Sequence, residues 1–273
     1  MALRYLVRMS DSSLSLRREG GALRGLRYLY RVPLLLLHVV LGLPPTLLCV
    51  MVVPLGAIRV GDETLAYRMI RWWQGTLMHV FGFRLQRIGT PHPGATLFVA
   101  NHVSWVDISM LHSQRMMGFV AKAEIAGWPL VGWLAARGET IFHKRGNTES
   151  LGGVLHEMAQ RLRAGRSVGV FPEGRTRGGE EVGPFHARIF QAAVETDTPV
   201  QPVALRYGER GDAQTRVAFA PGESFFGNFV RLLGEPARRA EVHFLEPIGA
   251  HDVEGRRRIA EISRARIVAA MNS

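Results

Sequence analysis

Two side chains that together perform acid–base chemistry lie five positions apart in the segment Asn-His-Val-Ser-Trp-Val-Asp, residues 101–107. A carboxylate bonded to one imidazole nitrogen fixes the tautomer, and the other nitrogen can then remove a proton from a hydroxyl. The spacing alone is weak support, because the chain has ten histidines and roughly one in twenty is followed by aspartate at this distance, which gives about half a match by chance. His102 and Asp107 are therefore a candidate catalytic pair whose meaning depends on its surroundings.

Two further polar blocks have the composition of ligand-binding loops. The first, Phe-Pro-Glu-Gly-Arg-Thr-Arg at residues 171–177, holds a carboxylate, a glycine and two arginines: Glu173, Gly174, Arg175 and Arg177. Such residues can form a turn that binds an anion through paired hydrogen bonds. The second block, residues 138–145, ends in the basic pair Lys144 and Arg145.

The elements expected around these residues define a fold class. The predicted strands are residues 95–100, 118–121, 140–142, 167–171, 200–205, 216–220 and 241–244, and the predicted helices are 105–114, 129–136, 147–164, 184–195 and 255–270. This alternation predicts an α/β domain with a largely parallel sheet flanked by helices. Active-site groups of such domains gather at the carboxyl ends of the strands, where all three polar clusters fall.

The spacing of the pair also requires a bend in the chain. Five residues on a regular helix are separated by about 140° of rotation, so two mid-helix side chains at this spacing do not meet. We expect His102 in the turn after the first strand and Asp107 in the first turns of the following helix. Ser104 is then a candidate helix cap, not a nucleophile.

The first part of the chain indicates a membrane anchor. We divide the chain into a basic segment (1–31), a membrane-anchoring helical region (32–83) and an α/β domain (84–273). No formally charged residue occurs from Val32 to Ile58, a run long enough to cross a bilayer as one helix. Pro44 and Pro45 interrupt it and favour a helical hairpin that enters and leaves the same leaflet. A single span, a cleaved signal and a buried core helix are the alternatives.

Residues 62–83 have helical periodicity, with Trp72 and Trp73 close to Arg68 and Arg71, as at a membrane interface or on a helix packed against the domain. Because the amino-terminal end is rich in arginine, we expect this end to stay in the cytoplasm. With a hairpin, the α/β domain stays on the cytoplasmic face as well.

Composition excludes several classes of protein. The single cysteine, Cys49, rules out an internal disulfide framework and a thiolate metal cluster. The net charge of +11 favours an anionic partner, either lipid head groups or a phosphorylated substrate, and no motif supports nucleic acid. No spacing of metal ligands is present, so we expect no bound metal.

The motif Gly-x-Ser-x-Gly of serine hydrolases occurs at 165–169, but a predicted helix precedes it and a predicted strand follows, the reverse of a nucleophile elbow. A non-catalytic membrane adaptor is the remaining alternative.

The polar blocks together resemble a known family. The His102–Asp107 segment, the Arg145 block, Phe-Pro-Glu-Gly at 171–174 and Pro-Val-Gln-Pro-Val at 199–203 have the order and approximate spacing of the four motifs of the bacterial 1-acyl-glycerol-3-phosphate acyltransferase (lysophosphatidic acid acyltransferase) family. Lys122 with Glu124, and Pro129 with Gly132, also look like family features. The resemblance covers roughly residues 65–250, and the amino-terminal apolar segment resembles the family's membrane-embedded helical pair.

The resemblance implies a reaction and a role for each residue. His102 would be the general base, with Asp107 as its partner. Arg145 would bind the phosphate of the acceptor, and Lys122 would belong to the substrate-binding residues. Glu173 and Gly174 would shape the acceptor site, assisted by Arg175 or Arg177. The reaction would transfer a fatty acyl group from an acyl-coenzyme A or acyl-carrier-protein thioester to a lysophospholipid hydroxyl, without an acyl-enzyme, a bound cofactor or a metal.

Two departures from the family pattern bear on the acceptor. The family's Glu-Gly-Thr-Arg-Ser is here Glu-Gly-Arg-Thr-Arg, and its Phe-Lys-x-Gly is here Phe-His-Ala-Arg at 185–188. The implied acceptor is therefore 1-acyl-glycerol-3-phosphate, with lyso-ornithine lipid or another lysolipid as the alternative. The implied location is the cytoplasmic face of a bacterial inner membrane.

Overall fold

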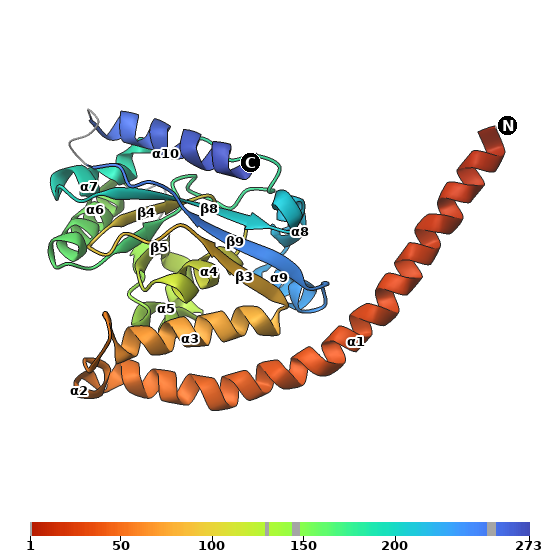
Figure 1. The fold of residues 1–273 in the computed structure, drawn as a ribbon, viewed down its shortest axis with the longest axis horizontal. Helices are drawn as coiled ribbons and strands as arrows, with labels where there is room; N and C mark the ends of the chain where they lie inside the picture. Colours follow the sequence, from red (N-terminus) through yellow and green to blue (C-terminus); the bar gives the residue numbers. More distant parts are fainter. Residues whose placement is uncertain (1, 129–130, 144–147, 250–254) are drawn as a thin grey trace.

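The computed structural model describes residues 2–128, 131–143, 148–249 and 255–273. Its body is a mixed sheet between two layers of helices, and one long amino-terminal helix lies outside the lower layer in Figure 1. The predicted α/β class, with a largely parallel sheet flanked by helices, is confirmed.

The described residues form a seven-stranded sheet in the order β3-β9-β8-β4-β7-β5-β6. The strands are β3 (Phe83–Ile88), β4 (Leu97–Ala100), β5 (Gly118–Lys122), β6 (Ile141–His143), β7 (Val168–Val170), β8 (Val200–Tyr207) and β9 (Arg238–Phe244). Every neighbouring pair is parallel except β8 and β9, so β9 and β3 run opposite to the other five strands. The carboxyl ends of β4, β7 and β8 therefore lie together.

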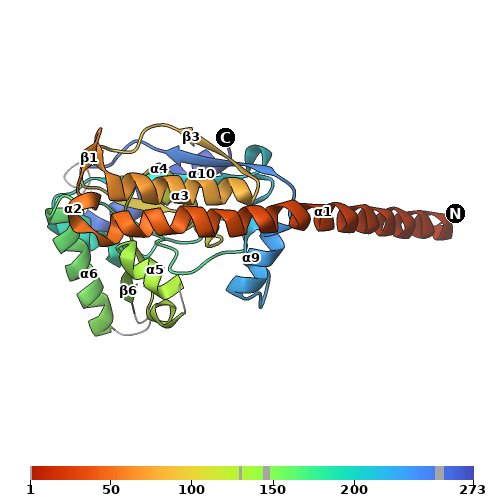
Figure 2. The ribbon, with the colours of Figure 1, turned by 90° about the horizontal axis from the view of Figure 1, so that it is seen from below.

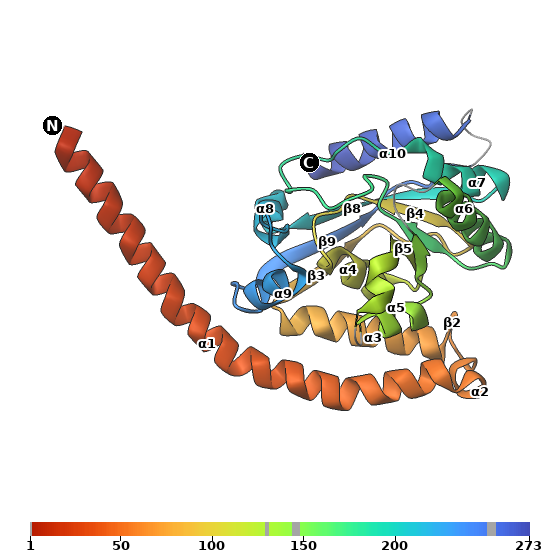
Figure 3. The same ribbon diagram turned by 180° about the vertical axis from the view of Figure 1, so that it is seen from behind.

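Helices cover both faces of the sheet. One layer holds α3 (Leu65–Val80), α4 (Val106–Gln114), α8 (Gln214–Val217) and α9 (Phe225–Leu233), and the other holds α6 (Thr148–Arg163), α7 (Gln191–Glu195) and α10 (Gly255–Met271). α5 (Val131–Arg137) lies on the α3 side in Figure 3. Central strands are buried on both sides, as is typical of parallel sheets: in β4, Phe98 packs into the α3–α4 core and Leu97 into the α6–α10 core.

Two strand predictions need correction. Residues 216–220 do not form a strand, because α8 spans Gln214–Val217 and the Asn228 side chain binds the carbonyls of Val217 and Ala218, which therefore need no neighbouring strand. In the seven-stranded sheet, the strand that the periodicity did not predict is β3. It lies at the edge of the sheet, mostly exposed, and its sequence Phe-Arg-Leu-Gln-Arg-Ile has only a short apolar alternation.

The amino-terminal helices form a pair that turns later than predicted. α1 (Ala2–Met51) continues through Pro33, Pro44 and Pro45, so the predicted break at Pro44–Pro45 is wrong. The helix curves instead, as helices that contain proline do. The Thr46 hydroxyl donates to the Gly42 carbonyl at 2.8 Å in the same stretch. The turn comprises α2 (Val53–Gly56) and the hairpin β1 (Arg59–Val60) and β2 (Glu63–Thr64).

After this turn α3 runs back along α1, and Figure 2 shows the two helices side by side. Thr64 caps α3 by accepting a hydrogen bond from Tyr67 N. The segment Leu23–Met51 is long and apolar enough to cross a membrane. Many of its apolar side chains are more than half exposed: Leu23, Leu26, Leu29, Leu36, Leu37, Val40, Leu41, Leu48 and Met51.

Part of the basic amino-terminal segment has partners inside the protein. Arg24, Arg27, Tyr28 and Arg31 donate hydrogen bonds to the carbonyls at and just beyond the end of α9. Arg31 is the most buried, with Nη1 at 3.0 Å from Leu233 O and 2.7 Å from Glu235 O. Cations are favourable where a helix ends in unpaired carbonyls, so these contacts attach α1 to the domain.

Candidate active site

His102 and Asp107 lie where the sequence predicts, in the turn that joins β4 to α4. β4 ends at Ala100, and Asp107 is the second residue of α4. The Asn101 side chain fixes the turn to β8, because its amide donates to Leu205 O at 3.0 Å and its oxygen accepts from Leu205 N at 2.8 Å. The neighbouring strand thus positions the start of the candidate catalytic segment.

The two candidate catalytic side chains are hydrogen-bonded. His102 Nδ1 lies 2.8 Å from Asp107 Oδ2, with the carboxylate fully buried and the His102 side chain 16% exposed. The same carboxylate oxygen accepts from Val103 N at 2.7 Å and Ser104 N at 2.9 Å. Because Asp107 is already the acceptor of these donors, the imidazole proton belongs on Nδ1, and Nε2 is the basic nitrogen.

Tyr207 completes the surroundings of Asp107. It is the last residue of β8, and its hydroxyl donates to Asp107 Oδ1. Burial raises the pKa of Tyr207 well above its usual value, and the adjacent Asp107 raises it further, so the hydroxyl keeps its proton and remains a donor. Both oxygens of the Asp107 carboxylate therefore have donors.

The imidazole of His102 is held by stacking. Its ring lies on Phe171, with centroids 3.9 Å apart and an angle of 13° between the planes. Phe171 in turn stacks on Phe119 of β5 at 5.5 Å. No described side chain bonds to Nε2, so this nitrogen is free to take a proton from a substrate.

Glu173 binds backbone N–H groups of two segments at the site. Its carboxylate accepts from His102 N and from Gly183 N, both at 2.9 Å, and lies 3.3 Å from Arg177 Nε. Arg177 N also donates to His102 O at 2.8 Å. Burial raises the pKa of Glu173, whereas the two backbone donors act in the opposite direction. Glu173 and Arg177 thus bind the backbone N–H and carbonyl of His102, the candidate base, and they pair with each other.

The other predicted site residues are more open. Gly174 turns the loop with φ +72°, a conformation that glycine adopts without strain, and an added Cβ would lie 3.2 Å from His186. Arg175 and Lys122 are exposed and have no bonded partner among the described residues. Arg145 lies outside the described residues. The predicted carboxyl-end cluster therefore brings together His102, Asp107 and the Glu173 loop.

Two residues at the site, Tyr207 and Asn228, were not predicted from the sequence. Tyr207 lies two positions beyond the predicted strand 200–205, at the edge where polar groups were expected, which is the signal that could have identified it. Asn228 of α9 accepts from Ser104 Oγ at 3.2 Å and from Trp105 Nε1 at 3.1 Å. The Ser104 hydroxyl therefore does not cap α4, contrary to our expectation. Ser167 lies immediately before β7 and after α6, in the predicted reverse order, so it is not on a nucleophile elbow.

Comparisons with known proteins identify the family of the chain. A family model described as Acyltransferase matches residues 86–206. A lyso-ornithine lipid O-acyltransferase of Pseudomonas aeruginosa is 35% identical over 190 residues, covering 70% of this chain and 73% of that protein. One from Brucella abortus is 33% identical, covering 76% and 82%. A 1-acyl-sn-glycerol-3-phosphate acyltransferase of Neisseria meningitidis is 35% identical, covering 51% and 55%.

The fold has a counterpart among solved structures. The 1-acyl-sn-glycerophosphate acyltransferase PlsC of Thermotoga maritima superposes with a TM-score of 0.71 and 18% sequence identity, covering 92% of this chain and 96% of that one. The fold and the comparisons together define an acyltransferase. The chain belongs to the lysophospholipid acyltransferase family, whose members include the lyso-ornithine lipid and 1-acyl-sn-glycerol-3-phosphate enzymes.

Proposed function

We propose that the protein transfers a fatty acyl group from an acyl thioester to the free hydroxyl of a lysolipid, with His102 as general base. The observation that carries this proposal is the bond of His102 Nδ1 to the buried Asp107, which leaves Nε2 without a described partner. This arrangement suits removal of a proton from a hydroxyl.

The chemistry follows from this geometry. His102 Nε2 takes the proton of the acceptor hydroxyl as its oxygen adds to the thioester carbonyl. The tetrahedral intermediate then breaks its carbon–sulfur bond, and the thiolate leaves and takes the proton from the imidazolium. The buried Asp107 stabilises that imidazolium, and Phe171 keeps the ring in place. No acyl-enzyme, metal or cofactor is needed, since the thioester of coenzyme A or acyl carrier protein supplies the activated acyl group.

For the acceptor, we propose lyso-ornithine lipid as the first candidate. The relatives with that name align over 70% and 76% of this chain, against 51% for the Neisseria enzyme. The pairing of Arg177 with Glu173 agrees with it, because one of the two loop arginines is then not free for a phosphate. The exposed Arg175 favours a second candidate, 1-acyl-sn-glycerol-3-phosphate.

For the location, we propose the cytoplasmic face of a bacterial inner membrane. The exposed apolar surface of α1 supports contact with lipid, and the α1–α3 pair would let the acceptor enter from the bilayer. A water-soluble thioester donor would reach the site from the cytoplasm.

The experiment uses purified protein with labelled acyl thioester and each of the two lysolipids. The wild type is compared with His102→Ala and with the control His156→Ala, an exposed histidine on α6. We expect acyl transfer to at least one acceptor and a loss of about 10²–10⁴ in rate for His102→Ala alone. Turnover by His102→Ala at the wild-type rate would exclude the proposed base. Faster acylation of lyso-ornithine lipid would identify the acceptor, and the opposite preference would favour the phosphate-bearing one.

A further inference from the structure

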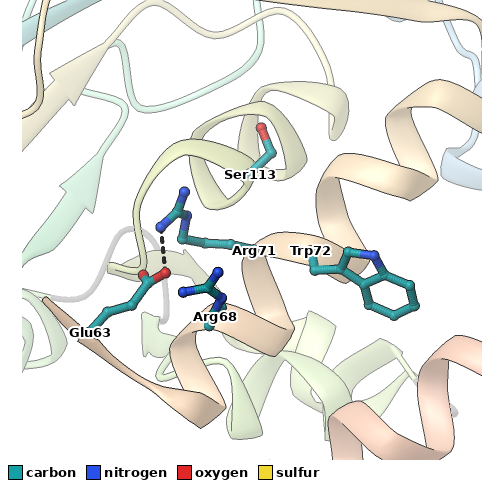
Figure 4. Close-up of a pocket in the computed structure, with 5 residues that line it drawn as sticks. All are labelled: Glu63, Arg68, Arg71, Trp72 and Ser113. Carbon is teal, nitrogen blue, oxygen red and sulfur yellow. Dashed lines mark hydrogen bonds and ion pairs between the residues drawn. The ribbon is translucent and has the colours of Figure 1, made fainter. Parts of the chain in front are cut away.

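A pocket of about 330 Å³ lies between α3 and α4, away from the catalytic pair. Figure 4 shows its lining: Glu63, Arg68, Arg71, Trp72 and Ser113. Asp107 and Ser113 are on the same helix, and the separation of six positions corresponds to about 9 Å along its axis. The pocket is therefore near the opposite end of α4 from His102.

The two arginines of the pocket are only partly balanced by acidic groups of the protein. Arg71 Nη1 lies 2.6 Å from Glu63 Oε1, but Arg71 Nε is buried without an acceptor in the described part of the chain. Arg68 is exposed and has no described partner. With Glu63 balancing one of the two arginines, the lining keeps one excess positive charge.

One lining residue of the pocket, Trp72, lies against α1. Trp72 is 47% exposed, and its ring lies 6.4 Å from that of His38 on α1. A Cβ added at Gly42 would lie 3.4 Å from Trp72, which places this tryptophan against the α1 turn that carries the exposed Leu41. A tryptophan between arginines and an apolar helix is typical of the membrane–water interface.

We propose that this pocket binds the phosphodiester of an anionic phospholipid, a membrane lipid that is neither donor nor acceptor. Arg68 and the free edge of Arg71 would bind the phosphate oxygens, and Trp72 and Leu41 would contact the glycerol and acyl chains. The excess positive charge of the lining matches the negative charge of a phosphodiester. The bound lipid would hold the α1–α3 pair at a fixed depth. The inference rests on the membrane location proposed above and does not depend on the catalytic role of His102.

The test is binding of the purified full-length protein to phosphatidylcholine vesicles with and without phosphatidylglycerol, in the absence of thioester. The variants are Arg68→Gln, Arg68→Gln/Arg71→Gln and the charge-matched control Arg84→Gln/Arg87→Gln on β3. Arg68→Gln breaks no described internal contact, so it serves if the double variant folds poorly. We expect phosphatidylglycerol to strengthen wild-type binding, and each pocket arginine lost to weaken it about fivefold. The control should bind almost like the wild type.

An equal loss in the pocket and control variants would overturn the site, because it would indicate general attraction to the surface. Protection of the protein from unfolding by inorganic phosphate that depends on Arg68, without preference for phosphatidylglycerol, would overturn the lipid ligand. His102→Ala should keep the phosphatidylglycerol preference. A wild type that binds in this way but transfers no acyl group would disprove only the proposed function.

Discussion

The hydroxyl of Tyr207 donates a hydrogen bond to Asp107 Oδ1, on the oxygen that His102 does not use. The two residues are 100 positions apart, and the sheet brings them together because β8, which ends at Tyr207, lies beside β4. Asp107 therefore has donors on both oxygens, and its orientation toward His102 is fixed from two sides.

Tyr207→Phe tests this contact. The substitution keeps the ring, which packs near Phe83, and removes only the hydroxyl. We expect kcat to fall about tenfold to a hundredfold with KM almost unchanged, since a buried hydrogen bond to a charged group contributes about 1.5–3 kcal/mol. Steady-state kinetics would measure this. Tyr67→Phe is the control, because it removes a hydroxyl bond to Glu139 far from the site and should leave kcat unchanged. Equal kinetics in wild type and Tyr207→Phe would contradict the positioning role.

Asp107→Asn tests the tautomer of His102. The amide has one acceptor oxygen, whereas the carboxylate accepts from His102, two backbone N–H groups and Tyr207. We expect a loss of kcat of about 10⁴, the magnitude seen when the carboxylate of a Ser-His-Asp triad becomes an amide. Single-turnover assays would measure it, with the exposed Asp62→Asn as control. A loss of less than about tenfold would show that the imidazole keeps its tautomer without the carboxylate.

The parts that the sequence predicted are those set by local patterns. Short apolar runs identified six of the strands, and the polar residues after them identified the edge of the sheet where His102, Asp107 and Glu173 meet. Contacts between distant segments leave no such pattern. β3 was missed because it is a short edge strand, and the break at Pro44–Pro45 was predicted wrongly because local rules do not include the support that α3 gives to α1. The contact of Tyr207 with Asp107 could not be predicted without knowing that β8 lies beside β4.

The pH dependence of stability reports on Glu173. Burial raises the pKa of Glu173 above its usual value of 4.5 in the folded protein. The folded state therefore binds the carboxyl proton of Glu173 more tightly than the unfolded state does. Protonation of Glu173 contributes its full stabilisation below pH 4.5, and this stabilisation is lost as the pH rises through the raised pKa. Thermal midpoints of wild type and Glu173→Gln across this range should show the wild type losing its advantage as pH increases. An advantage that grows with pH would mean that Gly183 N, His102 N and Arg177 outweigh the cost of burial.

Gly174→Ala tests the loop that follows Glu173. Its φ of +72° is unfavourable for any residue with a Cβ, at a cost of roughly 1–2 kcal/mol, and the new methyl would press on His186 at 3.2 Å. We expect lower stability and lower kcat/KM, since the turn fixes both Glu173 and Arg175. Gly178→Ala is a matched control in the same loop, because nothing lies within 4 Å of its added Cβ. Denaturant unfolding and kinetics of the two variants should therefore differ, and identical results would contradict a strained turn.

Arg31→Met tests whether the amino-terminal helix supports the catalytic segment. The variant keeps apolar bulk but removes the donor to Leu233 O and Glu235 O, which leaves buried carbonyls at the end of α9 without a partner. We expect a loss of about 1–3 kcal/mol, seen as a thermal midpoint lower by about 2–4 °C per kcal/mol in detergent. Activity should fall too, because α9 carries Asn228, which accepts a hydrogen bond from Ser104 next to the proposed catalytic pair. Arg59→Met, at an exposed arginine in the turn between α1 and α3, is the control. Reduced stability with unchanged activity would show that α1 is attached to the domain but does not support the active site.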